Sequence, residues 1–478
     1  MEEMKNKIPL DFFQNYHILP QEGDKVAICG ETPMEALEDL RLMLNKDVEP
    51  VIVSKEEIDT GLQALLIEDI SKTTEGEIVI TEDETQNLLA QTKDAPVIRL
   101  VNSIFLKAVH SRASDIHIEP YENEAIVRIR VDGVMHEIMK FPKSQYASVS
   151  SRIKVMAKLN LAEKRLPQDG RMRLKASDSL VDVRVSTVPT IYGERIVLRL
   201  LDKSMKLLTL EELGLNEYYY EKIKYLINHP YGILLLTGPT GSGKSTTLYA
   251  ILLSLKSPFK NIITIEDPVE YQIPGIGQIQ VNPKIDLTFA NGLRSIVRQD
   301  PDIIMVGEIR DNETAEIAIH ASLTGHLVLS TLHTNDAPTA ISRLVDMNIE
   351  NYLISSSLRG AIAQRLVRKL CDKCKKPYNA SSRLKELGIN TSKLKTATLY
   401  KEAGCDACLN TGFKGRIGIF EILIIDEEMD RLIVKTNDAN EIRTLARKKG
   451  MLTLFEDGIN KACEGITTVE EVLRATMT

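Results

Sequence analysis

Hydrophobic and polar positions follow different periods in successive parts of this chain, and the changes of period divide it into units. Residues 1–68 combine two short apolar runs, KVAICG and PVIVS, with two stretches of helical periodicity, which predicts one small α/β domain. Residues 69–95 are rich in acidic residues and have little periodicity, which is typical of a linker. A length of 478 residues likewise predicts about three folded domains.

The segment 96–204 is predicted to be an α+β domain. Apolar residues have helical spacing at 97–110 and 146–159, and they alternate with polar ones, as in strands, in SDIHIEP, AIVRIRVDG, VDVRVSTVP and ERIVLRLL. Asp132 and Gly133 end one of these strands with the sequence of a hairpin turn. Residues 205–368 then alternate apolar strands with helices, the pattern of a parallel sheet covered by helices.

The end of the chain is predicted to contain a small cysteine-bearing subdomain, 369–416, and a helical region, 417–478. No apolar run reaches the ~18 residues needed to cross a bilayer. The N-terminal MEEMKNKIPLDFF has acidic residues and a proline where a signal peptide would be apolar. We therefore expect a protein that stays in the cytoplasm.

A glycine-rich loop carries the strongest chemical signal. GPTGSGKST follows the apolar run YGILLLT and precedes the helix-compatible TTLYAILLSL. Its glycines allow successive N–H groups to surround phosphates, Lys244 would reach the β- and γ-phosphates, and Ser245 would hold Mg²⁺. An ordinary glycine-rich turn would not need this strand and helix. We expect ATP with Mg²⁺ to bind at Gly238, Pro239, Thr240, Gly241, Ser242, Gly243, Lys244, Ser245 and Thr246.

Carboxylates at two predicted strand ends are candidates for hydrolysis. PDIIMVGEIR ends in Glu308, but Gly307 stands where loops of this class commonly have Asp, so Glu308 is expected to act through a water. NIITIEDPVEY ends in three crowded carboxylates, of which Glu270 could polarise water and Asp267 could lie near the metal. A solvated acidic turn explains this second cluster equally well.

Histidines and arginines near these strand ends admit more than one role. His326 and His333 flank LVLST, and a regular strand would put them on opposite faces. One could sense the phosphate, whereas a structural role fits either. Arg294, Arg298 and Arg310 could stabilise charge on the γ-phosphate or form salt bridges between subunits.

Four cysteines have the spacing of a metal site. Cys371 and Cys374 form one C-x2-C pair, and Cys405 and Cys408 form a second one, as in tetrahedral tetrathiolate zinc sites. With four protein ligands the zinc would be structural. An iron–sulfur cluster and a pair of disulfides are the alternatives, which nearby lysines and a reducing cytoplasm disfavour.

The charge balance, with 60 Lys and Arg against 67 Asp and Glu, gives a net charge of −7. This argues against nucleic acid as the main partner, although it leaves room for a local basic face.

Taken together, GPTGSGKST, ITIEDPVEY, RSIVRQDPDIIMVGEIRD, TGHLVLSTLHTNDA and the cysteine pairs resemble the type II and type IV secretion and pilus-assembly ATPases. SRASDIHIEP, VDVRVSTVPTIYGERIVLRLLDK and GFKGRIGIFEIL extend the resemblance, which is greatest to the type II secretion branch. It implies a RecA-like P-loop ATPase core preceded by a PAS-like α+β domain, a small N-terminal adaptor domain and a zinc-binding subdomain.

The resemblance also implies a function and partners. The protein would be a cytoplasmic homo-hexamer that hydrolyses ATP to drive pseudopilus assembly and protein export. Its N-terminal domain would dock on inner-membrane platform proteins, which would attach it peripherally to that membrane. Lys244, Glu308, Asp267 and Glu270 would serve hydrolysis, and the α+β domain would supply arginines to the γ-phosphate, with Arg184 and Arg199 the first candidates and Arg195 the next.

Three other functions remain open. A type IV pilus extension ATPase is the nearest, although residues 1–70 lack the Arg-Leu-Gly motif with which some pilus-type relatives bind a cyclic dinucleotide. The cysteine pairs disfavour the retraction ATPases, which lack them. A RecA-like nucleic-acid motor and a nucleotide-switched scaffold belong to other classes; the acidic charge and low aromatic content disfavour the motor.

Overall fold

A computed structural model describes parts of residues 8–62, then 78–80, 95–176, 179–202, 207–379 and 398–477. It divides into two compact units, Met1–Met205 and Lys206–Thr478, which are considered separately. Most of the predicted linker 69–95 lies outside the described residues. In the described part of the chain, no helix is both long and apolar enough to span a membrane.

The first unit begins with a small sheet in the order β1-β2-β3, in which β1 and β2 are antiparallel and β2 and β3 are parallel. Apolar residues of α3, among them Leu37 and Leu40, are buried in the same core as Ile18 and Val26 of the strands. The elements are β1 (Ile18–Pro20), β2 (Lys25–Ile28), α3 (Met34–Leu44) and β3 (Glu49–Ile52).

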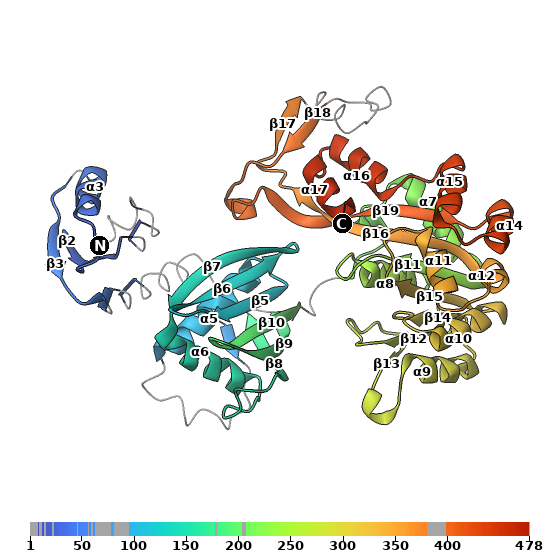
Figure 1. Cartoon of the computed structure of the whole chain (residues 1–478), viewed down its shortest axis with the longest axis horizontal. Helices are drawn as coiled ribbons and strands as arrows, with labels where there is room; N and C mark the ends of the chain where they lie inside the picture. Colours follow the sequence, from blue (N-terminus) through green and yellow to red (C-terminus); the bar gives the residue numbers. More distant parts are fainter. Residues whose placement is uncertain are drawn as a thin grey trace. The chain divides into compact units, whose positions relative to one another are not determined.

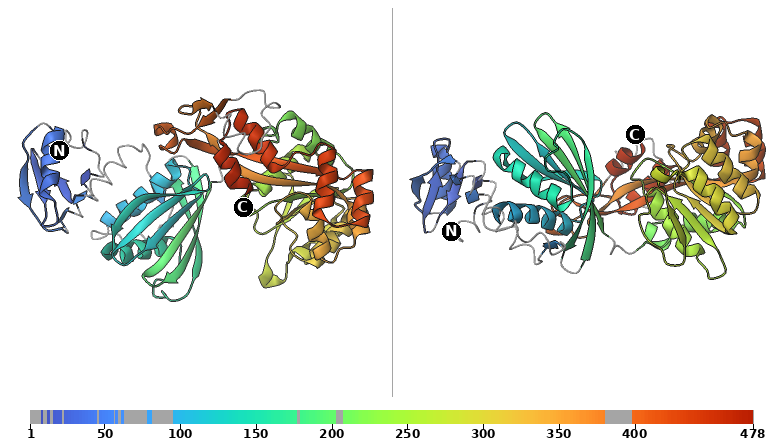
Figure 2. Two further views of the ribbon diagram at one scale, coloured as in Figure 1. Left: turned by 45° about the horizontal axis from the view of Figure 1, so that its top comes forward. Right: turned by 90° about the horizontal axis from the view of Figure 1, so that it is seen from below.

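The rest of this unit is an antiparallel seven-stranded sheet in the order β4-β8-β9-β10-β5-β6-β7. Its helices share one core with the inward-facing strand residues, and both lie against one face of the sheet (Figures 1 and 2). The elements are β4 (Ile78–Ile80), α5 (Ala95–His110), β5 (Asp115–Pro120), β6 (Glu124–Val131), β7 (Val134–Pro142), α6 (Lys143–Met156), β8 (Gln168–Ala176), β9 (Ser179–Thr190) and β10 (Gly193–Asp202).

Sequence patterns locate this part of the fold well. The predicted hairpin turn is present, since Asp132 and Gly133 both have positive φ, at 49° and 87°, between the paired residues Val131 and Val134. The predicted helix 146–159 is displaced and ends at Met156, because Lys158 already has left-handed backbone geometry, with φ of 56°.

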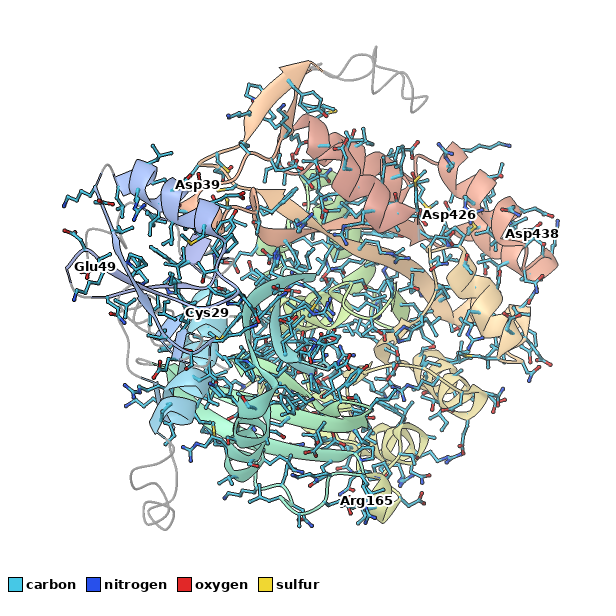
Figure 3. The ribbon with its side chains drawn as sticks, turned by 60° about the vertical axis from the view of Figure 1, so that its left-hand side comes forward. Cys29, Asp39, Glu49, Arg165, Asp426 and Asp438 are labelled. Carbon is cyan, nitrogen blue, oxygen red and sulfur yellow. The ribbon has the colours of Figure 1, made fainter. Side chains whose placement is uncertain are left out.

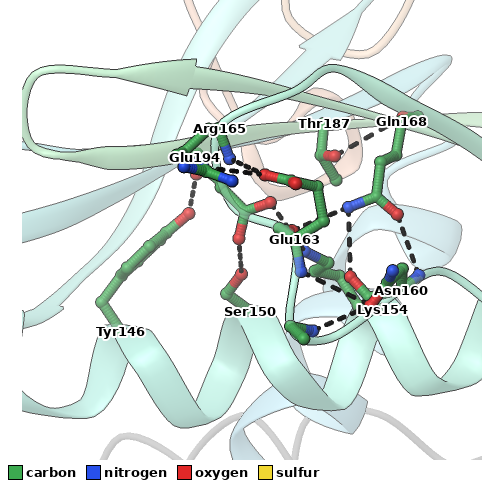
Figure 4. A network of polar contacts seen from close by, with 10 residues as sticks. Tyr146, Ser150, Lys154, Asn160, Glu163, Arg165, Gln168, Thr187 and Glu194 are labelled. Atoms are coloured by element: carbon green, nitrogen blue, oxygen red, sulfur yellow. Dashed lines mark hydrogen bonds and ion pairs between the residues drawn. The ribbon is translucent and has the colours of Figure 1, made fainter.

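A buried ion pair ties α6 to β10 and to the loop before β8 (Figure 4). Lys154 is 1% exposed, and its Nζ donates to Glu194 Oε1 at 2.8 Å and to the Glu163 carbonyl oxygen at 2.6 Å. The Tyr146 hydroxyl donates to the carbonyl oxygen of Glu194. Burial of two charges is costly unless each is hydrogen-bonded, as here, so the network specifies one arrangement of helix, strand and loop.

The second unit contains a seven-stranded sheet in the order β13-β12-β14-β15-β11-β16-β19, all parallel except for the β16–β19 pair. Strands β11, β14 and β15 are almost wholly apolar and buried, as expected of a sheet buried on both faces. Its strands are β11 (Gly232–Thr237), β12 (Ile262–Glu266), β13 (Gly277–Gln280), β14 (Ile303–Val306), β15 (Leu327–Leu332), β16 (Leu358–Leu370) and β19 (Phe413–Ile424).

Helices cover this sheet, and two short strands form a separate ribbon. The helices up to β16 are α7 (Glu217–Ile227), α8 (Lys244–Leu255), α9 (Phe289–Ile296), α10 (Asn312–Leu323), α11 (Thr339–Asp346) and α12 (Asn351–Ser357). The ribbon is β17 (Lys376–Asn379) with β18 (Thr398–Lys401), and the 3-10 turns are Glu211–Leu213, Pro283–Ile285, Val297–Gln299 and Asp406–Cys408. The predicted α/β class with a RecA-like core is thus confirmed.

The predicted helical region 417–478 begins with a strand. FKGRIGIFEILI pairs with β16 along most of its length, because its β-branched and aromatic residues suit a buried strand. The helices follow it as α14 (Glu427–Lys435), α15 (Ala439–Lys448), α16 (Leu454–Cys463) and α17 (Val469–Thr476). Asp426 and Asp438, labelled in Figure 3, cap α14 and α15 by accepting N–H bonds from Met429 and Asn440.

Candidate functional site

The phosphate loop joins β11 to α8 and has the backbone that its glycines permit. Gly238, Gly241 and Gly243 have φ of 148°, 79° and 91°. Gly243 caps α8, so the positive end of the helix dipole points into the loop. A Cβ at Gly238 would lie 2.6 Å from the Gln364 carbonyl oxygen, and one at Gly243 would lie 2.7 Å from Gln364 Nε2. Strand β16 therefore presses against the loop at two points where only glycine fits.

The Lys244 side chain hydrogen-bonds to the backbone of the loop that precedes it. Its Nζ donates to the carbonyl oxygens of Gly238 at 2.6 Å and Pro239 at 3.0 Å, and the side chain is buried. Burial lowers the pKa of Lys244 to about 8; the Arg365 cation adds to this effect and the Glu308 carboxylate opposes it. An anion bound in the loop would therefore interact with the Lys244 ammonium and accept hydrogen bonds from the N–H groups of the loop.

The parallel strands bring Glu308 to the same edge of the sheet. β14 lies between β12 and β15, and β15 pairs with β11 up to Thr237. Glu308 forms an ion pair with Arg310, and one of its carboxylate oxygens lies within hydrogen-bond distance of His333 Nε2, at 3.3 Å. Burial raises the pKa of Glu308, but Arg310 and His333 outweigh it and hold that pKa below its ordinary value. Glu308 is therefore an ionised acid held in one orientation beside the loop.

Gly307 explains why this strand lacks an aspartate. A Cβ there would lie 3.3 Å from the Ile265 carbonyl oxygen and 3.4 Å from the Glu266 Cα. The Gly307 N–H donates to that same oxygen at 2.8 Å, so the neighbouring strand is already in contact. A side chain at position 307 would therefore require the β12 backbone to shift by a few tenths of an ångström.

The acidic turn after β12 divides into one structural and two exposed carboxylates. Glu266 is buried and accepts hydrogen bonds from Tyr249, from Thr264 at 2.6 Å and from Gln278 at 3.0 Å. Glu266 is therefore satisfied by hydrogen bonds within the fold, and the expected roles near the metal and the water stay predictions for Asp267 and Glu270. Asp267 and Glu270 remain exposed.

The two histidines lie at opposite ends of β15 rather than on its two faces, because the strand spans only the residues between them. His326 Nδ1 is 2.7 Å from the Ala321 carbonyl oxygen, a structural contact, whereas His333 contacts Glu308.

Of the three arginines that the sequence placed near the acidic strand ends, Arg310 is the one that contacts Glu308. Arg294 pairs with Glu313, and Arg298 donates to the carbonyl oxygen of Arg294.

Sequence reasoning missed Gln364 and Arg365 of β16. Gln364 Oε1 accepts from Thr247 at 2.7 Å, and Arg365 Nη2 donates to the Asn335 carbonyl oxygen at 2.9 Å. Both are nearly fully buried, and in the described chain no carboxylate forms an ion pair with Arg365. The signal was present in AIAQRLV, where two polar residues interrupt an apolar run at a cost that requires partners.

The candidate arginines of the α+β domain belong to the first unit. Arg199 donates to Asp115 at 2.9 Å and Arg195 to Glu119 at 2.6 Å. Arg184 lies opposite Arg199 in the β9–β10 register and opposite Arg171 in the β8–β9 register. Three arginines thus form one row across adjacent strands.

The four predicted cysteine ligands converge. Their Sγ atoms all lie within 4.8 Å of one another, with 3.9 Å between Cys371 and Cys405 and 3.8 Å between Cys374 and Cys408. Four sulfurs at ~2.3 Å from one tetrahedral zinc ion would be ~3.8 Å apart, so the cluster fits zinc. All four cysteines are free thiols, so the disulfide alternative is wrong.

Lys244 generates a prediction about pH. The nucleotide-free protein loses the ammonium charge as the pH rises through about 8, whereas bound triphosphate favours the charged form. The ATP dissociation constant should be constant below about pH 7 and increase above about pH 8, by at most about tenfold per pH unit. Calorimetric titration across this range checks it. The Lys244→Arg variant should show no such increase, and a wild-type constant that stays level to about pH 9.5 would refute the assignment.

Comparison with known proteins agrees with this geometry. The family described as Type II/IV secretion system protein matches residues 90–474, and the MshEN domain matches residues 1–72. Type II secretion system protein E of Dickeya dadantii is 47% identical, covering 99% of this chain and 98% of the relative. The Type IV pilus assembly ATPase PilB of Thermus thermophilus is 45% identical, covering 98% of this chain and 54% of the relative.

Solved structures show the same fold. The pilus retraction motor PilT with bound ADP has a TM-score of 0.53 at 26% identity, covering 78% of this chain and 95% of that one. The Legionella pneumophila ATPase DotB has a TM-score of 0.58 at 23% identity, covering 78% and 94%. The chain is therefore a secretion ATPase of the type II/IV secretion system protein family.

Proposed function

We propose that this protein hydrolyses ATP to drive pseudopilus assembly and protein export by a type II secretion system. The observation that carries the proposal is the phosphate loop with an ionised, doubly paired Glu308 at the same sheet edge. Identity near 47% to a type II secretion protein along almost its whole length favours this branch. The pilus assembly ATPase relative keeps pilus extension as the second candidate.

Each residue near the loop has a chemical task in this proposal. The loop from Gly238 to Thr246 and Lys244 bind the phosphates, and the exposed Ser245 hydroxyl would hold Mg²⁺ with Asp267 nearby. When bound, Mg²⁺ neutralises charge on the phosphates. Glu308 orients the attacking water and accepts its proton, and Glu270 is a second candidate for that contact.

We assign Arg184 and Arg199, with Arg195 as the next candidate, to the γ-phosphate of a neighbouring subunit in a homo-hexamer. The arginine row supports this assignment: like charges on directly opposed strand positions repel, and the Arg184 side chain has no hydrogen-bond or ion-pair partner among the residues that the structure describes. Within the row, Asp115 pairs with Arg199, and it also pairs with Arg130 of β6 at 3.8 Å. A bound anion would relieve the remaining repulsion.

Mixing of subunits tests the shared site. Arg199→Ala subunits added to wild-type protein should reduce ATP turnover per wild-type subunit by more than dilution, since each variant fails to complete its neighbour's site. Phosphate release is measured against the mixing ratio. Arg173→Ala, which removes an exposed arginine paired with Asp182, is the matched control. A loss strictly proportional to dilution would contradict a site shared between subunits.

We also propose that the cysteine cluster holds structural zinc, which supports the ribbon between β16 and β19. The metal should contribute about 10 kcal/mol or more to folding of the subdomain, as in other tetrathiolate sites. The backbone N–H groups of Cys405 and Gly412 donate to Cys408 Sγ at 3.2 Å, as expected around a thiolate ligand.

Metal analysis checks this proposal. Purified wild-type protein should contain about one zinc per chain, and Cys374→Ser should lose it together with several degrees of thermal stability. Cys463→Ser, outside the cluster, should retain the metal. Wild-type protein without zinc after growth in zinc-containing medium, or full zinc in the Cys374→Ser variant, would rule the site out.

The proposed location and partners follow from the same branch. We assign the MshEN-matched residues 1–72 to docking on inner-membrane platform proteins, so the protein would be cytoplasmic and peripherally attached through partners. Nucleic acid is not proposed as a partner, since the chain carries a net charge of −7.

Gene deletion distinguishes export from pilus extension. In the native bacterium, loss of the gene should cause exoproteins to accumulate in the periplasm while surface pili remain. Complementation with wild-type but not Lys244→Ala protein should restore export. Loss of pili with normal secretion would instead identify a pilus extension ATPase.

A further inference from the structure

The turn after β15 connects the candidate site to the C-terminal helices. Five successive residues, His333 to Ala337, each hydrogen-bond or pair with a different element of the second unit. The pairs are His333 with Glu308 after β14, Thr334 with Thr237 of β11, Asn335 with Arg365 of β16, Asp336 with Arg443 of α15, and Ala337 with Glu421 of β19. We call residues 333–337 the hub turn.

One side of the hub turn is fixed to the phosphate site. The Thr237 hydroxyl donates to the Thr334 carbonyl oxygen at 3.0 Å and accepts from the Thr334 N–H at 2.9 Å. Thr237 immediately precedes Gly238. Arg365 Nη1 would lie 3.0 Å from a Cβ at Gly238, and its Nη2 donates to Asn335. The turn is therefore hydrogen-bonded both to the residue that precedes the loop and to the arginine beside the loop.

The other side of the hub turn is attached to α15 by an ion pair. Arg443 Nη2 lies 2.6 Å from Asp336 Oδ2, with the two side chains 31% and 24% exposed. Burial raises the pKa of Asp336, but bonds from Thr339 and Arg443 outweigh it, so its pKa lies below the ordinary value and the pair stays ionised. Glu421 is nearly fully buried and accepts the Ala337 N–H at 2.9 Å.

Glu308 depends on the hub turn more than the loop does. The loop is also supported by its own backbone, by α8 and by Gln364. Glu308 has two side-chain partners, and one of them, His333, belongs to the turn. A small shift of the turn should therefore misplace the acid while the phosphates remain bound, and misplacement of about 1 Å can slow an enzyme by about a hundredfold.

We propose that Asp336 and Arg443 are positioning residues for ATP hydrolysis, through which α15 controls the orientation of Glu308 and hence turnover rather than nucleotide affinity. The inference rests on the proposed function, in that it requires hydrolysis at this loop. The side-chain partners of Arg443 are Asp336 and Asn440 rather than residues of the phosphate loop.

Arg443→Gln tests the inference in the full-length protein. Its kcat for ATP should fall about tenfold, while the dissociation constant of a non-hydrolysable ATP analogue changes less than about twofold. Arg443→Lys, which keeps the charge, should recover most of the loss. Arg447→Gln is the matched control: it lies one turn further along α15, is 53% exposed and pairs with Glu456 at 2.7 Å, so its kcat should stay at the wild-type value.

A double mutant separates positioning from general destabilisation. In the His333→Ala variant the link between the turn and Glu308 is already broken. If Arg443 acts through the turn, the double variant Arg443→Gln/His333→Ala should therefore have a kcat less than about twofold below that of His333→Ala alone. Independent, multiplicative losses would overturn the proposal, as would a normal kcat in Arg443→Gln. If circular dichroism shows Arg443→Gln to be unfolded, Asp336→Asn, which retains an acceptor for Thr339, provides the same test.

The proposed function and this inference fail differently. Wild-type protein without ATP turnover would refute the ATPase function. Wild-type turnover that neither Arg443→Gln nor Asp336→Asn reduces would leave that function intact and refute the positioning role alone.

Discussion

The close approach of β16 to the phosphate loop is the constraint on which the rest of the site depends. The Gln364 carbonyl oxygen occupies the space that a Cβ would take at Gly238, its side-chain amide lies against Gly243, and both positions have positive φ, which favours glycine. The same contact orients Thr247 of α8 and places Arg365 beside the loop. The glycine pattern is therefore explained by a neighbouring strand as well as by the phosphates.

Charge at the site is unbalanced in favour of an anion. Lys244 and Arg365 are buried cations, and burial lowers the pKa of both. Backbone carbonyl oxygens accept their hydrogen bonds, whereas carboxylates are at a greater distance. Arg310 and Glu308 compensate each other. A polyphosphate would supply the missing negative charge, so the free energy of its binding includes relief of this electrostatic cost.

Local patterns predicted much of the fold and the ligand-bearing motifs. Periodicity identified the buried strands of the core and the helices α5 and α6, while cysteine spacing identified four residues that converge. These features depend on residues near one another in the chain, or on a geometry that a single spacing encodes. The phosphate loop is readable for the same reason.

The features of the site that the sequence did not predict depend on contacts between segments that are far apart in the chain. Glu266 is one of the three crowded carboxylates in the sequence, yet it differs from the other two because Tyr249 and Gln278 bind it in the fold. Asp336 and Arg443, 107 positions apart, carry no local signal of their pairing. The tertiary fold decides such contacts: the strand order brings β16 beside β11 and the loop, and the packing of α15 brings Arg443 to the turn after β15.

The central claim is that Glu308 activates water for hydrolysis of ATP held in the loop. Comparing wild type with Glu308→Gln in a phosphate-release assay, with ATP affinity measured in parallel, tests it most directly. The account predicts similar ATP affinity and turnover reduced by at least about a hundredfold, because the amide cannot accept the proton. Turnover of Glu308→Gln at the wild-type rate would contradict it.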